Sequence, residues 1–101
     1  MRKNIFHLEG KVWVYPSQSA QWYFVSLAGE TALHMKEQYS ALRRGWGSLP
    51  VRVTIGKTTW DTSIFPDKRI QGYLLPIRAS VRVAQAIQVG DMLSFKLRVR
   101  V

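Results

Sequence analysis

The sequence contains no cysteine and only two histidines, His7 and His34. Without cysteine, neither a disulfide framework nor a thiolate metal site can form, and a reducing compartment is permitted. The two imidazoles lie far apart in the sequence and show none of the short spacings typical of histidine metal ligands. We therefore expect neither a metal ion nor another cofactor.

Long hydrophobic runs are also missing. A helix that spans a bilayer needs about 20 mostly apolar residues, and no segment approaches that length. Near the N-terminus, Glu9 and Lys11 interrupt the hydrophobic stretch, which does not have the pattern of a secretory signal. The sequence predicts a cytoplasmic protein with no membrane partner.

Acidic residues are few. The chain has 15 lysines and arginines against 6 aspartates and glutamates, a formal net charge of +9 and a pI of about 10.5. Polyanions such as nucleic acids are natural partners of a chain this basic. Net charge also keeps small domains soluble, so charge alone leaves nucleic-acid binding open.

The length and composition favour one domain with one core over residues 1–101. The chain has 101 residues, of which 47% are hydrophobic and 21% charged, as in an ordinary globular protein. We expect a monomer.

Alternating hydrophobic residues predict that most of the chain forms β-strands. The clearest pattern lies near the C-terminus, where Phe95 and Leu97 alternate with polar residues and are expected in the core. Strands are predicted over Phe6–Tyr15, Trp22–Leu27, Val51–Ile55, Thr58–Phe65, Ile70–Leu75 and Leu93–Val101. Gly56-Lys57 predicts a tight hairpin turn, Pro66-Asp67-Lys68 another turn, and Gly10 a bulge or a close backbone contact.

Two segments have the periodicity of helices instead. In the segment Glu30–Arg44, the positions Ala32, Met35, Tyr39 and Leu42 share one face. In the segment Ser80–Gln88, Ser80 is expected to cap the helix, and Val83 and Ile87 to share a face.

The predicted elements repeat. The segments Tyr23–Ile55 and Tyr73–Val99 both run from a strand through a helix and a glycine-containing turn to a strand. This repeat predicts a mainly β fold, a small pseudo-symmetric barrel of six to seven strands capped by two helices. Coincidence stays open as an alternative, because strand–helix–strand units recur in many folds.

Four segments of the sequence together resemble a small bacterial family, domain of unknown function number nineteen-oh-five. They are Arg44–Val51, Gly56–Pro66, Tyr73–Arg82 and Gly90-Asp91, in order along the chain. The resemblance implies a double-split β-barrel, an architecture shared with AbrB-like transition-state regulators. Those regulators bind DNA as dimers, whereas here both halves of the barrel lie in one chain.

A ligand-binding region is our first candidate site. Its residues are Trp46, Trp60, Thr62, Arg78 and Arg82. Indole rings offer broad surfaces for stacking, and we expect Trp60 to be partly exposed beside a concavity because polar residues flank it. The alternative is that the tryptophans belong to the core.

A basic strand face is the second candidate. Strand alternation places Lys96, Arg98 and Arg100 on one face, and Arg52 extends the group if its strand is adjacent. Such a stripe would bind phosphates without reading sequence. The alternative is an ordinary solvated barrel exterior, whose charges also protect strand edges.

No residue pattern predicts catalysis. Ser63, His34 and Asp61 lack the glycine pattern of a nucleophile elbow, and Gly56-Lys57-Thr58 lacks the upstream glycine of a phosphate-binding loop. The preferred interpretation is a non-enzymatic module that binds a small ligand or a protein; the alternative is a nucleic-acid-binding protein. A continuous stripe of arginines in the structure would favour nucleic-acid binding. A cleft rimmed by tryptophan would favour binding of a small ligand.

Overall fold

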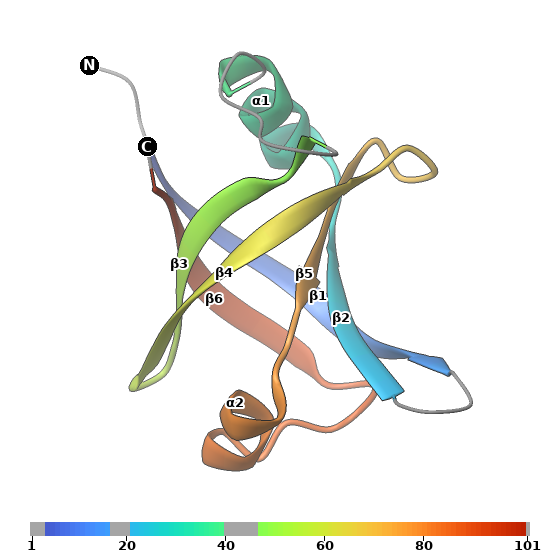
Figure 1. Cartoon of the computed structure of the whole chain (residues 1–101), viewed down its shortest axis with the longest axis vertical. Helices are drawn as coiled ribbons and strands as arrows, with labels where there is room; N and C mark the ends of the chain where they lie inside the picture. The colour runs from blue at the N-terminus through green and yellow to red at the C-terminus, as the bar shows by residue number, and fades with distance from the viewer. Residues whose placement is uncertain (1–3, 17–20, 40–46, 101) are drawn as a thin grey trace.

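The computed structural model describes residues 4–16, 21–39 and 47–100. Its elements, in chain order, are β1 (Ile5–Pro16), β2 (Gln21–Leu27), α1 (Glu30–Gln38), β3 (Leu49–Ile55), β4 (Thr58–Asp67), β5 (Gly72–Pro76), α2 (Ala79–Ala84) and β6 (Met92–Val99). The six strands close into a barrel in the order β1-β2-β5-β4-β3-β6, and every neighbouring pair is antiparallel (Figure 1). The predicted mainly β fold, a small barrel with two helices, is confirmed.

Side-chain alternation explains why these segments form strands around one core. In β6, Leu93, Phe95, Leu97 and Val99 are buried while the residues between them are exposed. In β3, Leu49, Val51, Val53 and Ile55 are buried in the same way. Burying one face of every strand is what a small barrel requires, because its interior is filled by side chains. The prediction that Phe95 and Leu97 lie in the core is confirmed.

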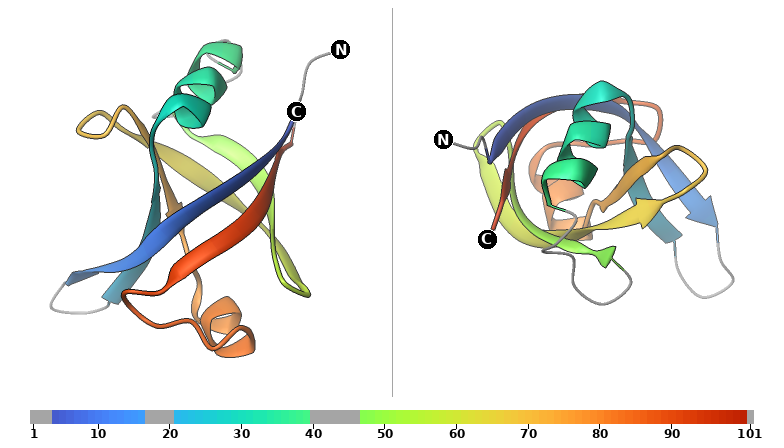
Figure 2. Two further views of the ribbon diagram at one scale, coloured as in Figure 1. Left: turned by 180° about the vertical axis from the view of Figure 1, so that it is seen from behind. Right: turned by 90° about the horizontal axis from the view of Figure 1, so that it is seen from above.

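The barrel consists of two halves with the same topology. The first half runs β1-β2-α1-β3 and the second β4-β5-α2-β6, and exchanging the halves reproduces the strand order of the barrel. The two helices lie at opposite ends of the barrel, and α1 lies across one of them (Figures 1 and 2). The repeat expected from the sequence is therefore present in the topology.

The first helix begins at Glu30, as predicted. Ala32, Met35 and Tyr39 are buried against the barrel, and the ring of Tyr39 packs edge-on against Phe6 with the centroids 6.5 Å apart. The helix ends at Gln38, with Tyr39 as its C-cap, so it is shorter than the predicted Glu30–Arg44. Leu42 and Arg44 lie outside the described residues.

The second helix differs from the prediction at both ends. Arg78, not Ser80, occupies the N-cap position, and the helix ends at Ala84 instead of Gln88. Ala86 has a φ of 52°, and the N–H groups of Ala86 and Ile87 donate to the carbonyls of Val83 and Arg82. These two bonds form a Schellman motif, which ends a helix with a left-handed residue, here alanine in place of the usual glycine.

The predicted common face of Val83 and Ile87 is therefore wrong. Ile87 is buried, but it follows the end of the helix, while Val83 is exposed. The turn after β4 also comes later than predicted, because β4 continues through Pro66 to Asp67. The next strand begins at Gly72, where a Cβ atom would lie 1.8 Å from the carbonyl oxygen of Leu27.

Strand β1 changes partner halfway along its length. Residues Ile5–Lys11 pair with β6, and residues Val12–Pro16 pair with β2. A Cβ atom on Gly10 would lie 2.5 Å from Cγ1 of Val25, so glycine allows a close contact at this transition. Of the two possibilities predicted for Gly10, a bulge or a close contact, the structure shows the close contact. The predicted Gly56-Lys57 hairpin turn is present between Ile55 and Thr58.

Candidate functional site

The outer surface of β3 and β6 carries four basic side chains, which we call the basic face: Arg52, Lys96, Arg98 and Arg100. Arg52 and Arg98 are directly opposite each other in the β3–β6 register. They point outward because Val51, Val53, Leu97 and Val99 fill the inward positions. Arg100 follows the end of β6 and is tied to β3, since its N–H donates to the carbonyl of Pro50 over 2.9 Å. The structure brings all four predicted residues together.

Asp61 on β4 lies beside these cations. It pairs with Arg52 in the β3–β4 register and accepts two hydrogen bonds from its guanidinium, of 2.7 and 3.1 Å. Arg100 Nη1 lies 3.5 Å from the same carboxylate. The hydrogen bonds from Arg52 lower the pKa of Asp61, and the charges of Arg100 and Arg98 act in the same direction. Asp61 therefore stays ionised at neutral pH and partly neutralises the basic face.

Hollows open along this surface in the described part of the chain. One of about 470 Å³ is lined by Asn4, Arg52, Arg98, Val99 and Arg100. A second, of about 290 Å³, is lined by Ile5, Arg52, Thr54, Thr59, Lys96 and Arg98. Arg52 and Arg98 border both of these hollows, so an anion in either would meet two guanidinium groups.

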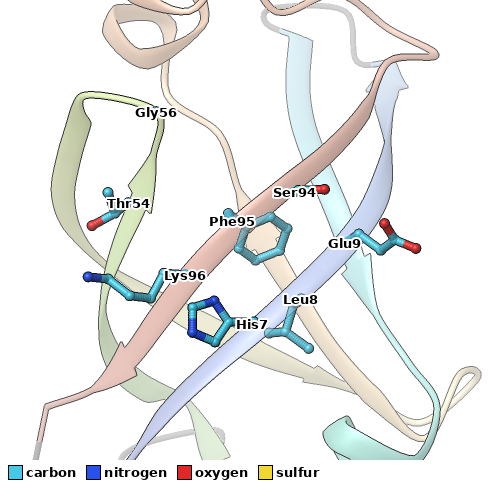
Figure 3. Close-up of a pocket in the computed structure, with 8 residues that line it drawn as sticks. All are labelled: His7, Leu8, Glu9, Thr54, Gly56, Ser94, Phe95 and Lys96. Atoms are coloured by element: carbon cyan, nitrogen blue, oxygen red, sulfur yellow. The ribbon is translucent and has the colours of Figure 1, made fainter.

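The third hollow, of about 710 Å³, extends the surface toward β1 (Figure 3). His7 on β1 lies beside Lys96 on β6, with Thr54 of β3 on the other side of Lys96. Farther along, Glu9 lies beside Ser94. The lining changes from basic to mixed polar along β1, and the positive charge is concentrated at the β3–β6 seam.

The described residues of the first candidate region do not line any of the three hollows above. Trp46 lies outside the described residues. Trp60 is only 8% exposed and belongs to the hydrophobic core, with Nε1 buried and without a hydrogen-bond partner in the described part of the chain. The prediction that Trp60 is partly exposed is therefore wrong. Thr62 is half-buried opposite Val51, two positions from Trp60 along β4.

The two arginines of that region make contacts within the fold. Arg82 donates from Nη1 to the carbonyl of Ile77 over 2.8 Å, and its guanidinium lies 3.7 Å from the centroid of the Tyr23 ring. Arg78 is exposed and donates from Nη2 to the backbone carbonyl of Asp61 over 2.9 Å. Arg78 thus lies at the β4 edge of the basic face, a position that the sequence did not reveal.

Ligands for a metal ion do not gather in the described ranges: no three His, Cys, Asp or Glu side chains are close enough to hold one. Among the same residues, no helix has the length and apolar character needed to cross a membrane.

Fold and site together define a small closed antiparallel β-barrel with a basic outer face. Residues 9–97 match the model of a protein family described as a domain of unknown function, DUF1905. The match covers most of the chain, which therefore belongs to this family, as its sequence motifs indicated. No curated protein matches the chain.

Proposed function

We propose that this protein binds nucleic acid through the phosphates, using the basic face. The observation that carries the proposal is the direct cross-strand pair of Arg52 and Arg98. Like charges placed opposite each other destabilise a sheet. Asp61 offsets part of this repulsion at Arg52, and an anion bound beside Arg98 would offset the rest. The proposed role is binding without catalysis, in the cytoplasm and as a monomer.

The closed barrel weakens one alternative explanation of these charges, the protection of strand edges. Charged residues often protect the free edge of a sheet from pairing with another chain. Here β3 is paired with β4 and β6, and β6 with β3 and β1, so neither strand is an edge. Edge protection therefore does not account for three arginines and a lysine on this seam.

Binding of a small ligand through Trp46, Trp60, Thr62, Arg78 and Arg82 has less support. The buried indole of Trp60 offers no stacking surface, and Arg82 is engaged with Ile77 and Tyr23. Arg78 is the member of that set best placed to contribute to the basic face.

The salt dependence of duplex binding tests the proposal. Each phosphate neutralised by a cation contributes about −0.9 to the slope of log affinity against log salt. With Asp61 already paired to Arg52, the expected slope lies between about −2.7 and −3.6, for three to four contacts. Arg98→Ala should weaken binding to every duplex sequence alike and make the slope shallower by about 0.9.

Lys68→Ala is the matched control, because it removes the same charge from the exposed turn between β4 and β5. It should change the affinity much less than Arg98→Ala does. Absence of binding at low salt, or equal effects of the two substitutions, would show that the basic face is only a solvated surface.

A further inference from the structure

The β1–β2 hairpin carries four aromatic side chains on its outer surface. Trp13 is paired with Phe24, and Tyr15 with Trp22, in the antiparallel register. Val12 and Val25, adjacent to these positions, are buried in the core, so the strand alternation places the four rings on the opposite face. We call Trp13, Tyr15, Trp22 and Phe24 the aromatic ladder.

The inner pair of the ladder is held in place, and the outer pair is open. The rings of Trp13 and Phe24 have centroids 5.2 Å apart and planes inclined by 34°. Trp13 Nε1 donates to Ser26 Oγ over 2.9 Å, which orients the indole. Tyr15 and Trp22 are 58% and 56% exposed. Adjacent large aromatic rings on a surface are typical of a binding site.

The aromatic ladder and the basic face are joined by one strand. The outward residues of β1 start at Ile5, opposite Arg98, continue past His7, opposite Lys96, and end at Tyr15, opposite Trp22. Ten residues of extended strand span about 33 Å. Single-strand sites on small barrels hold about 4 to 16 nucleotides, so one strand of nucleic acid has the length to reach both surfaces.

Positive charges also flank the ladder. Lys11 is exposed on β1, two residues before Trp13 and therefore on the same face. Arg69 lies within electrostatic range of Tyr15, and its charge is partly neutralised by Asp67, to which its Nη2 donates over 2.8 Å. A second copy of this chain, which also carries a net charge of +9, would be repelled, whereas a polyanion is attracted.

We propose that the aromatic ladder stacks unpaired bases and that the protein prefers single-stranded nucleic acid to duplex. This inference rests on the proposed function, since the basic face holds the phosphates. Aromatic side chains stack on bases of any sequence, and bases in a duplex are not available to them. The ladder therefore adds affinity that phosphate contacts alone do not provide.

The test compares three probes of the same length, about 12 nucleotides: a thymidine single strand, an abasic strand with the same phosphates, and a duplex. Tyr15→Thr and Trp22→Thr remove the open rings while keeping a residue suited to a strand. Each should weaken binding to the thymidine strand about tenfold. Binding to the abasic strand and to the duplex should not change. Val83→Thr, at an exposed apolar position on α2, is the control and should have no effect.

The outcomes separate this inference from the proposed function. If the ladder variants bind the thymidine strand as tightly as the unchanged protein while Arg98→Ala weakens it, the stacking proposal is overturned and the basic face stands. If no probe binds at low salt, both proposals fail. If the unchanged protein is a dimer and the ladder variants are monomers with unaltered affinity, a second copy covers the ladder and stacking is overturned.

Discussion

Asp61 places a carboxylate where a phosphate is proposed to bind. Its two hydrogen bonds to Arg52 and its proximity to Arg100 occupy donors that an anionic ligand would use. A carboxylate and a phosphate group can each make a bidentate contact with a guanidinium group through two oxygens, so the two compete for Arg52. Asp61 is therefore expected to limit the affinity of the basic face.

Replacement of this residue by its neutral isostere, Asp61→Asn, tests the competition. The variant should bind duplex DNA more tightly, because Arg52 becomes available and one negative charge is removed. The slope of log affinity against log salt should move toward about −3.6, the value for four contacts. Titration of affinity against salt concentration measures both effects. A decrease in affinity would instead show that Asp61 orients Arg52 for binding. Glu9→Gln, which removes a negative charge farther along β1, is the control.

At the level of elements, the end of α2 shows a conflict between local preference and tertiary packing. Ala86 adopts a left-handed conformation with a φ of 52°, which costs an L-residue about 1 kcal/mol. The conformation lets Ile87 enter the core directly after the helix. Burial of Ile87 offsets the backbone strain at Ala86.

The same substitution should therefore have opposite effects at two positions of this segment. Ala86→Gly should stabilise the protein by about 0.5 to 1 kcal/mol, because glycine adopts positive φ without strain. Ala84→Gly, within the helix, should destabilise it by about 0.5 to 1 kcal/mol. Urea unfolding measures both changes. Destabilisation by both glycines would show that Ala86 is not strained.

The strands were predictable from the sequence because alternation records burial, and β3 and β6 follow it without exception. In β4 the pattern is ambiguous: Trp60 and Ile64 point inward together with the polar Thr62, while Phe65 is exposed. Flanking polarity therefore suggested the wrong environment for Trp60. The end of α2 was missed because the left-handed position carries alanine and not glycine, the usual signal for that position.

The candidate site was predictable only in part, because the sequence does not show which strands lie side by side. Alternation placed Lys96, Arg98 and Arg100 on one face, but the β3–β6 contact that adds Arg52 depends on long-range topology. The aromatic ladder had a local signal: Trp13 and Tyr15, like Trp22 and Phe24, are two residues apart, and the flanking Val12 and Val25 are core residues. Large aromatic residues on both faces of one hairpin indicate a second buried or bound surface.

The whole molecule is organised by its two equivalent halves, which predicts tolerance of a circular permutation. The chain ends of the barrel are adjacent, since the N–H of Val99 donates to the carbonyl of Asn4 over 3.0 Å. Joining the termini with a short linker and opening the Gly56-Lys57 turn gives the order β4-β5-α2-β6-β1-β2-α1-β3. The new β6–β1 hairpin then takes the topological place of the former β3–β4 hairpin.

Because each half keeps its own local contacts and the new loop is short, the permutant should retain the barrel and most of its stability. Circular dichroism and urea unfolding measure these properties, and duplex binding reports whether the β3–β6 seam still assembles. A control permutant opened between Phe95 and Lys96 should fail to fold, because the cut divides a strand that pairs on both sides. Equal loss of structure in both permutants would mean that the barrel depends on the native order of its halves. The two halves would then share a topology but would not contribute equally to the stability of the barrel.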